Sequence, residues 1–152
     1  MTAPVLPNTD LVAMAWLASL PGFSAAMVGT TLPKPVNGIY SWAATGFVLA
    51  STVGGSPHHE YALRRPVVQV EGWWVQPGSN KPAWGQANGL CESIVAATYN
   101  EQLVRAPLAM RTGVAGARVI RANALTEPRR KPGDQGDAAV YWFDLALDWT
   151  TR

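Results

Sequence analysis

The chain has 152 residues, enough for one domain that buries roughly 70% of its unfolded surface without help from a metal or a disulfide. Charged residues make up only 14% of the chain, against about 25% in typical soluble domains, and seven tryptophans accompany that deficit. A net charge of +2 is too small to indicate nucleic-acid binding, no apolar run approaches the ~20 residues of a membrane span, and a single cysteine excludes an internal disulfide.

The low charge favours a protein that assembles with copies of itself or with other proteins. Interfaces are depleted of charged side chains and enriched in tryptophan and tyrosine. The alternative is a well-buried monomer whose surface is polar but uncharged. The N-terminal segment has no basic residue ahead of its first apolar stretch, so it does not read as a signal peptide.

The first predicted element is a helix from Leu11 to Leu20, preceded by N-cap side chains at positions 8–10 and ended by a Pro-Gly pair. Its sequence, LVAMAWLASL, has one polar residue, Ser19. A helix that is apolar all round must be covered on more than one side. In a domain of this size, a neighbouring subunit could supply part of that cover.

Two strands are predicted next. Residues 39–53 favour β structure, with Gly46 as a bulge or break and a Gly-Gly-Ser-Pro turn after them at 54–57. In Val67–Val75, valines and tryptophan alternate with polar residues, which is the two-residue period of a strand.

A second helix is predicted from Ala83 to Tyr99, because apolar side chains recur there at helical spacing. Its stripe consists of Ala87, Leu90, Cys91, Ile94, Ala97 and Thr98. A thiol inside such a stripe is expected to be a small core residue rather than a nucleophile. Proline and glycine interrupt residues 100–116, and no element is assigned there.

Two strands close the chain, Ala117–Leu125 and a final strand after a long loop. The final strand alternates, with Asp144 and Asp148 on the face opposite to its apolar residues. The apolar face holds Ala139, Tyr141, Phe143, Leu145, Leu147 and Trp149. The order helix, strand, strand, helix, strand, strand predicts one α+β domain over residues 1–152, with a mainly antiparallel sheet packed by two helices.

No pattern indicates a catalytic, cofactor or metal site. His58-His59-Glu60 is a compact titratable set, but adjacent side chains rarely ligate one metal together. Asp144 and Asp148 are ~13 Å apart along a strand, farther than the ~5–9.5 Å of glycosidase carboxylates. The glycines of Arg111–Ile120 precede a strand rather than a helix, so they do not form a phosphate-binding loop.

The candidate contact site is the loop before the final strand. Its charged residues are Glu127, Arg129, Arg130, Lys131, Asp134 and Asp137. The basic residues could meet phosphates, but the surrounding acids and the lack of aromatics within the loop favour pairing inside the loop or with a complementary protein surface. The loop is therefore either an ordinary long hairpin or a hairpin whose tip makes contacts.

The chain resembles the tail terminator (tail-completion) proteins of long-tailed bacteriophages, particularly those of actinobacteria. Four segments carry the resemblance: PNTDLVAMAWLASLPGF, RRPVVQVEGWW, the W-x₅-L-x₃-I pattern from Trp84 to Ile94, and VIRANALTEPRRKPGDQGDAAVYWFDLALDWT. In that family such a strand runs into a helix, and a Pro/Arg/Asp-rich loop separates the last two strands.

The resemblance implies a non-enzymatic α+β subunit of a virion, assembled in the host cytoplasm. It would form a hexameric ring that caps the tail tube, ends tube polymerisation and joins the tail to the head. The implied partners are other copies of the chain, the tail-tube protein and the head-closure or connector protein of the neck, with viral DNA only passing through the lumen. No cofactor, metal or membrane is implied, and the charged loop becomes a projecting contact element.

Two other classes of function stay open at this point. One is a head-closure or stopper ring protein of the neck. The other is a monomeric binding domain or small hydrolase.

Overall fold

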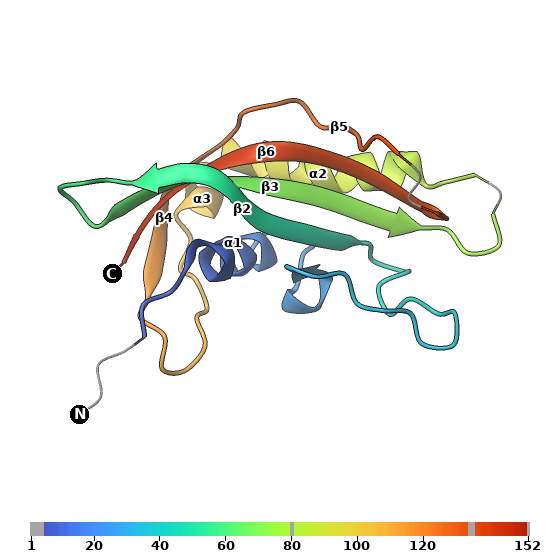
Figure 1. The fold of residues 1–152 in the computed structure, drawn as a ribbon, viewed down its shortest axis with the longest axis horizontal. Coiled ribbons are helices and arrows are strands. Elements are labelled where there is room, and N and C mark those ends of the chain that lie inside the picture. Colours follow the sequence, from blue (N-terminus) through green and yellow to red (C-terminus); the bar gives the residue numbers. More distant parts are fainter. Residues whose placement is uncertain (1–4, 80, 134–135, 152) are drawn as a thin grey trace.

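The computed structural model describes residues 5–79, 81–133 and 136–151 (Figure 1). In chain order the elements are α1 (Thr9–Ala18), a short 3₁₀ turn η1 (Ala25–Met27), β1 (Val28–Gly29), β2 (Phe47–Pro57), β3 (Leu63–Val75), α2 (Trp84–Thr98), α3 (Glu101–Val104), β4 (Ala117–Ala124), β5 (Arg129–Arg130) and β6 (Ala138–Thr151). The predicted α+β class is confirmed.

The described strands form one sheet in the order β1-β2-β3-β6-β4, with β5 paired beside β6. All pairings are antiparallel except that of β1 with β2. β6 is the central strand: β3 runs along one of its edges, while β4 and β5 share the other. The loop before β6 therefore contributes a strand of its own, which the sequence pattern did not predict.

Both long helices pack on one face of the sheet, here called the core face. The predicted apolar stripe of β6 lies there, and Phe143, Leu145, Leu147 and Trp149 are completely or almost completely buried. Two of the buried tryptophans connect elements through hydrogen bonds: Trp16 Nε1 donates to the Val104 carbonyl (3.2 Å) and Trp149 Nε1 donates to Thr9 Oγ1 (3.1 Å). These two bonds join α1 to α3 and to the last strand.

Helix α2 lies unusually close to β3 because the strand has a glycine beneath it. A Cβ on Gly72 would lie 2.8 Å from the Ala87 carbonyl oxygen and 3.1 Å from Cys91 Sγ. Any larger residue at this position would force the helix away from the sheet. The predicted stripe of α2 is confirmed, since Ala87, Leu90, Cys91, Ile94 and Ala97 are buried.

The opposite face of the sheet, here called the outer face, is covered only in part. A second apolar cluster, built around Trp42, Phe47, Val75, Ala138 and Val140, lies at one end of it. The connection between β1 and β2 provides this cover, and Figure 1 shows that connection at the end of the molecule opposite to the β2–β3 hairpin. The predicted strand over 39–53 was therefore wrong in its first half, because residues 39–46 form turns that insert Trp42 into the cluster.

The predicted turn at 54–57 was also wrong, since these residues continue β2. The glycines are part of a β-bulge, where the register shifts between Thr52 and Gly54 and Gly55 has a φ of +89°. A Cβ on Gly55 would overlap the backbone of Arg65 and Pro66 on the paired strand. The hairpin turns later, over residues 58–62.

The start of α1 shows how the predicted N-cap residues divide their roles. Asn8 caps the helix, with its Oδ1 accepting from Leu11 N (2.9 Å). Asp10 instead accepts from Thr52 N (3.0 Å) and Thr52 Oγ1 (2.7 Å), which satisfies a backbone donor on the edge of β2. Thr9 Oγ1 accepts a hydrogen bond from the indole N–H of Trp149.

Phe143→Ala is expected to lower the free energy of unfolding by about 3–5 kcal/mol, because it leaves a cavity under the helices. Asp144→Asn should cost much less, since that side chain is half-buried on the outer face. Urea unfolding followed by circular dichroism measures both. Equal losses in the two variants would contradict the assignment of the strand faces.

Candidate interaction surface

The predicted contact loop runs along the edge of β6 that β4 leaves free. Leu125 N donates to the Asp144 carbonyl (2.8 Å), and Lys131 N donates to the Val140 carbonyl (3.0 Å). Between these bonds, Arg129 and Arg130 pair with Trp142 and Tyr141. We call residues 125–131 the strap, and Figure 1 shows the segment that carries β5 following β6.

The basic residues of the strap lie against tryptophans on both faces of the sheet. Arg129 Cζ lies 5.1 Å from the ring centre of Trp142, and Lys131 Nζ lies 5.6 Å from the same ring. Arg130, on the other side of the strap, lies 4.5 Å over Trp84, the first residue of α2. Because neighbouring residues of a strand point to opposite faces, the side chains of the strap contact indoles on both faces of the sheet. Each such cation–π contact at an exposed site is worth about 0.5–1 kcal/mol.

Lys131 also forms an ion pair with a buried carboxylate. Its Nζ lies 2.6 Å from Glu71 Oε1, and Trp73 Nε1 donates to the other oxygen, Oε2, at 3.0 Å. Glu71 is only 8% exposed, so these two partners take the place of water around its oxygens. Lys131 is therefore an anchor of the strap, whereas Arg129 and Arg130 are exposed.

The predicted contact residues differ in how exposed they are. Glu127, Arg129, Arg130 and Asp137 are exposed, Lys131 is half-buried, and Asp134 lies outside the described residues. The predicted pairing inside the loop is not among the ion pairs of the described residues, which join Lys131 to Glu71, Arg105 to Glu101 and His59 to Glu60. Residues 125–131 lie along the sheet edge instead of projecting from it.

The aromatic partners of the strap were missed because they come from other elements. Trp73, Trp84 and Trp142 lie on β3, α2 and β6. The alternation of the final strand already placed Trp142 on the face away from the core, next in sequence to the buried Phe143. The indole on that face was the feature of the sequence that could have indicated an aromatic partner for the strap.

The other titratable candidates have structural surroundings. His58 Nδ1 accepts backbone N–H groups of Glu60 (3.1 Å) and Tyr61 (3.3 Å), so it closes the β2–β3 turn. Asp144 and Asp148 are half-buried residues of the outer face. Within the described ranges, no group of three or more His, Cys, Asp or Glu side chains could hold a metal ion. No helix there is long and apolar enough to span a membrane.

Cys91 is a core residue, as predicted. It is fully buried, and its Sγ lies 3.5 Å from the Tyr141 carbonyl oxygen as a donor. Burial raises the pKa of the thiol to about 12, while a hydrogen bond from the Gly72 backbone opposes the shift. The thiol is therefore protonated near neutral pH and is a poor nucleophile.

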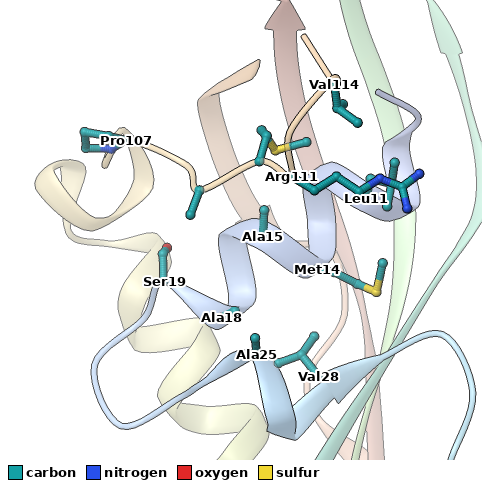
Figure 2. A pocket seen from close by; sticks show the side chains of 12 residues that line it. Leu11, Met14, Ala15, Ala18, Ser19, Ala25, Val28, Pro107, Arg111 and Val114 are labelled. Atoms are coloured by element: carbon teal, nitrogen blue, oxygen red, sulfur yellow. The ribbon is translucent and has the colours of Figure 1, made fainter. Parts of the chain in front are cut away.

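An apolar groove of about 450 Å³ runs along the side of α1 that faces away from the sheet. Figure 2 shows its walls: α1 on one side, the segment 107–114 on the other, and Ala25 and Val28 at the end of the groove. The lining residues are Leu11, Met14, Ala15, Ala18, Ser19, Ala25, Val28, Pro107, Ala109, Met110, Arg111 and Val114. Arg111 is the one charged member of this lining, and its side chain extends toward Leu11 in Figure 2.

The groove corresponds to the side of α1 that the chain covers only in part. Val12, Ala13, Trp16 and Leu17 are buried against the sheet, while the α1 residues of the groove lining are only partly buried or exposed. We call this feature the α1 groove.

No family model matches the chain, and no curated protein matches it. Among solved structures, the chain is similar to a chain of the particle described as "Virion of native gene transfer agent (GTA) particle". The two are 13% identical, the match covers 95% of this chain and 85% of that chain, and the TM-score is 0.46.

Lys131→Met is expected to destabilise the protein by about 1–3 kcal/mol, because it leaves the Glu71 carboxylate buried without its cation. Adding Glu71→Gln should recover part of this loss, since the remaining amide carries no charge. Lys81→Met, at an exposed site, is the matched control. Chemical unfolding gives the free energies, and hydrogen exchange at residue 131 reports release of the strap. Equal stability of Lys131→Met and the control would show that the ion pair contributes nothing.

Cys91 is expected to make the protein less stable at high pH. Below pH 9 both folded and unfolded thiols hold their proton, so the group adds no pH dependence. Between pH 9 and pH 12 the unfolded thiol ionises while the folded thiol does not. The free energy of unfolding then falls as pH rises, by at most about 1.4 kcal/mol per pH unit from this group.

Cys91→Ala should remove that contribution, leaving only the slope due to other groups. Urea unfolding of both proteins from pH 8 to pH 11 gives the difference between the slopes. Parallel pH profiles would contradict the raised pKa.

Proposed function

We propose that the chain is a structural protein of a phage-type virion, a ring-forming tail terminator. The observation that carries the proposal is the α1 groove. Helix α1 is apolar all round, and its own chain covers the side that faces the groove only in part. A helix of this kind needs cover on its remaining side, and a neighbouring subunit supplies it in a ring.

The composition supports assembly independently of the groove. The chain has half the usual share of charged residues and seven tryptophans. Several large apolar side chains are exposed, among them Val36, Ile39, Tyr61 and Tyr99. A subunit with two neighbours can bury such side chains in its contacts.

The strap supports contact with a neighbouring ring. Arg129 and Arg130 already lie over indoles, so less side-chain entropy remains to be lost when their exposed side chains meet a partner. Charged groups at the rim of an interface set its orientation and its rate of formation. We assign the strap to docking on the tail-tube protein or on the head-closure protein of the neck.

The resemblance in sequence favours the terminator over a head-closure or stopper ring. The strand-to-helix passage and the Pro/Arg/Asp-rich loop before the last strand are the features that support this choice. In the proposed ring, viral DNA passes through the lumen, and the cap both ends tube growth and presents a surface to the head.

Mass measurement in solution together with electron microscopy tests the ring. The expected result is a closed homo-oligomer, with six copies as the proposed number. Mixing with tail-tube protein should halt tube growth at a defined length, whereas a stopper protein would leave tube growth unchanged. A monomer at all concentrations, with and without tube protein, would sink the proposal in favour of a monomeric domain.

Reversing Arg129 and Arg130 to glutamate is expected to weaken docking on the neighbouring ring while leaving the chain folded and its own ring intact. Like charges brought together at an interface cost several kcal/mol. Lys131 is left in place, because its reversal would disturb Glu71. Lys34→Glu with Lys81→Glu applies the same change in net charge at other exposed sites.

Binding to preformed tail tubes and to the neck complex, at low and high salt, provides the measurement. The loss should be largest at low salt, where charges are least screened. Unchanged docking in the strap variant would assign the strap a purely structural role.

A further inference from the structure

The β2–β3 hairpin closes one end of the sheet, where β6 pairs with β3 as far as Leu63. Its ladder continues to the pair Pro57–Arg64, and His58 N closes the turn by donating to the Leu63 carbonyl (2.8 Å). Residues 51–57 are all exposed. Figure 1 shows the hairpin reaching past the helices at one end of the sheet. These exposed residues are therefore available for contact with a partner.

The turn of this hairpin presents the phenol of Tyr61 and the carboxylate of Glu60, which lies 3.4 Å from the Nε2 atom of the exposed His59. Tyr61 is 67% exposed, and its ring lies 4.8 Å from that of His58. Glu60 is the one acidic residue between Ser51 and Leu63, and it is exposed. The hydrogen bonds to His58 Nδ1 fix the backbone at both residues. We call residues 58–62 the hairpin tip.

The α1 groove has the opposite properties. It is concave and apolar, and its one charge is the cation Arg111 at the side of Leu11. At about 450 Å³ it has room for an aromatic side chain. An apolar site with one cation at its margin fits a ligand that combines an aromatic ring with a neighbouring carboxylate.

We propose that the hairpin tip of a second copy of this chain occupies the α1 groove, with Tyr61 among Leu11 and Met14 and the Glu60 carboxylate against Arg111. This inference rests on the proposed ring and names its subunit contact. Tip and groove belong to different parts of the chain, so the contact is heterologous. Such a contact leaves one tip and one groove unused in any open chain of subunits, and closure into a ring satisfies both.

Charge reversal tests the pairing directly. Glu60→Arg alone and Arg111→Glu alone should each weaken subunit association by roughly tenfold or more, because each creates a like-charge pair. The double variant should regain most of the association. Glu92→Arg with Arg118→Glu applies the same exchange at exposed sites on α2 and β4. Light scattering over a concentration series measures the oligomer in each case.

Cross-linking locates the contact independently. With Tyr61→Cys and Met14→Cys in one chain, mild oxidation should give a ladder of disulfide-linked oligomers. Tyr61→Cys with Tyr99→Cys, where Tyr99 is exposed at the end of α2, should not. Native Cys91 is buried and does not interfere.

The outcomes separate the contact from the ring. Wild-type rings that give no ladder and no rescue by the double reversal would overturn the hairpin contact and leave the ring standing. Rings dissolved by Val36→Ser with Ile39→Ser, but not by the tip variants, would assign the contact to that exposed turn and also overturn the proposal. Absence of wild-type assembly, with or without tail-tube protein, would overturn both the contact and the proposed function.

Discussion

Strand β6 makes the long-range contacts that hold the domain together. It pairs with β3 along one edge and with β4 and β5 along the other, and its core face is buried beneath both long helices. At its far end the indole of Trp149 donates to Thr9 at the start of α1. The register of β6 therefore decides which residues of three other strands face the core. A shift by one residue would move every buried side chain of the strand to the outer face.

The same alternation gives three consecutive basic residues different roles. Lys131 reaches the outer face, where Glu71 and two indoles hold it, and Arg129 shares that side. Arg130 points to the core face and lies on Trp84 at the start of α2. The strap thus connects β6, β3 and α2 without contributing to the apolar core. A run of like charges in a sequence does not by itself indicate a common partner.

Elements with a strong internal period could be predicted from the sequence. The stripe of α2 and the alternation of β6 were found to within one or two residues, because each repeats over many positions. Gly46 was predicted as a bulge or a break, and Gly55 was wrongly predicted to belong to a turn. A glycine can mark any of these, and only the facing atoms of Trp74 or of Arg65 and Pro66 decide between the roles. β5 has two residues and exists only because β6 offers it an edge. The apolar sequence of α1 indicated that the helix needs cover on more than one side. The groove itself could not be predicted, because its other wall is the segment 107–114, which is distant in sequence.

The central position of β6 also bears on how the protein is made. β6 is the last of the strands to leave the ribosome, yet β3, β4 and β5 all depend on it for pairing. Until it arrives, β3 has a free edge, and the core faces of α1 and α2 lack their main partner. Domains generally fold as units during synthesis, and here the unit is complete only when its last strand is present. A chain cut short by premature termination therefore lacks the sheet that positions α1 and its groove. Such chains cannot join an assembly in which a partner binds in that groove.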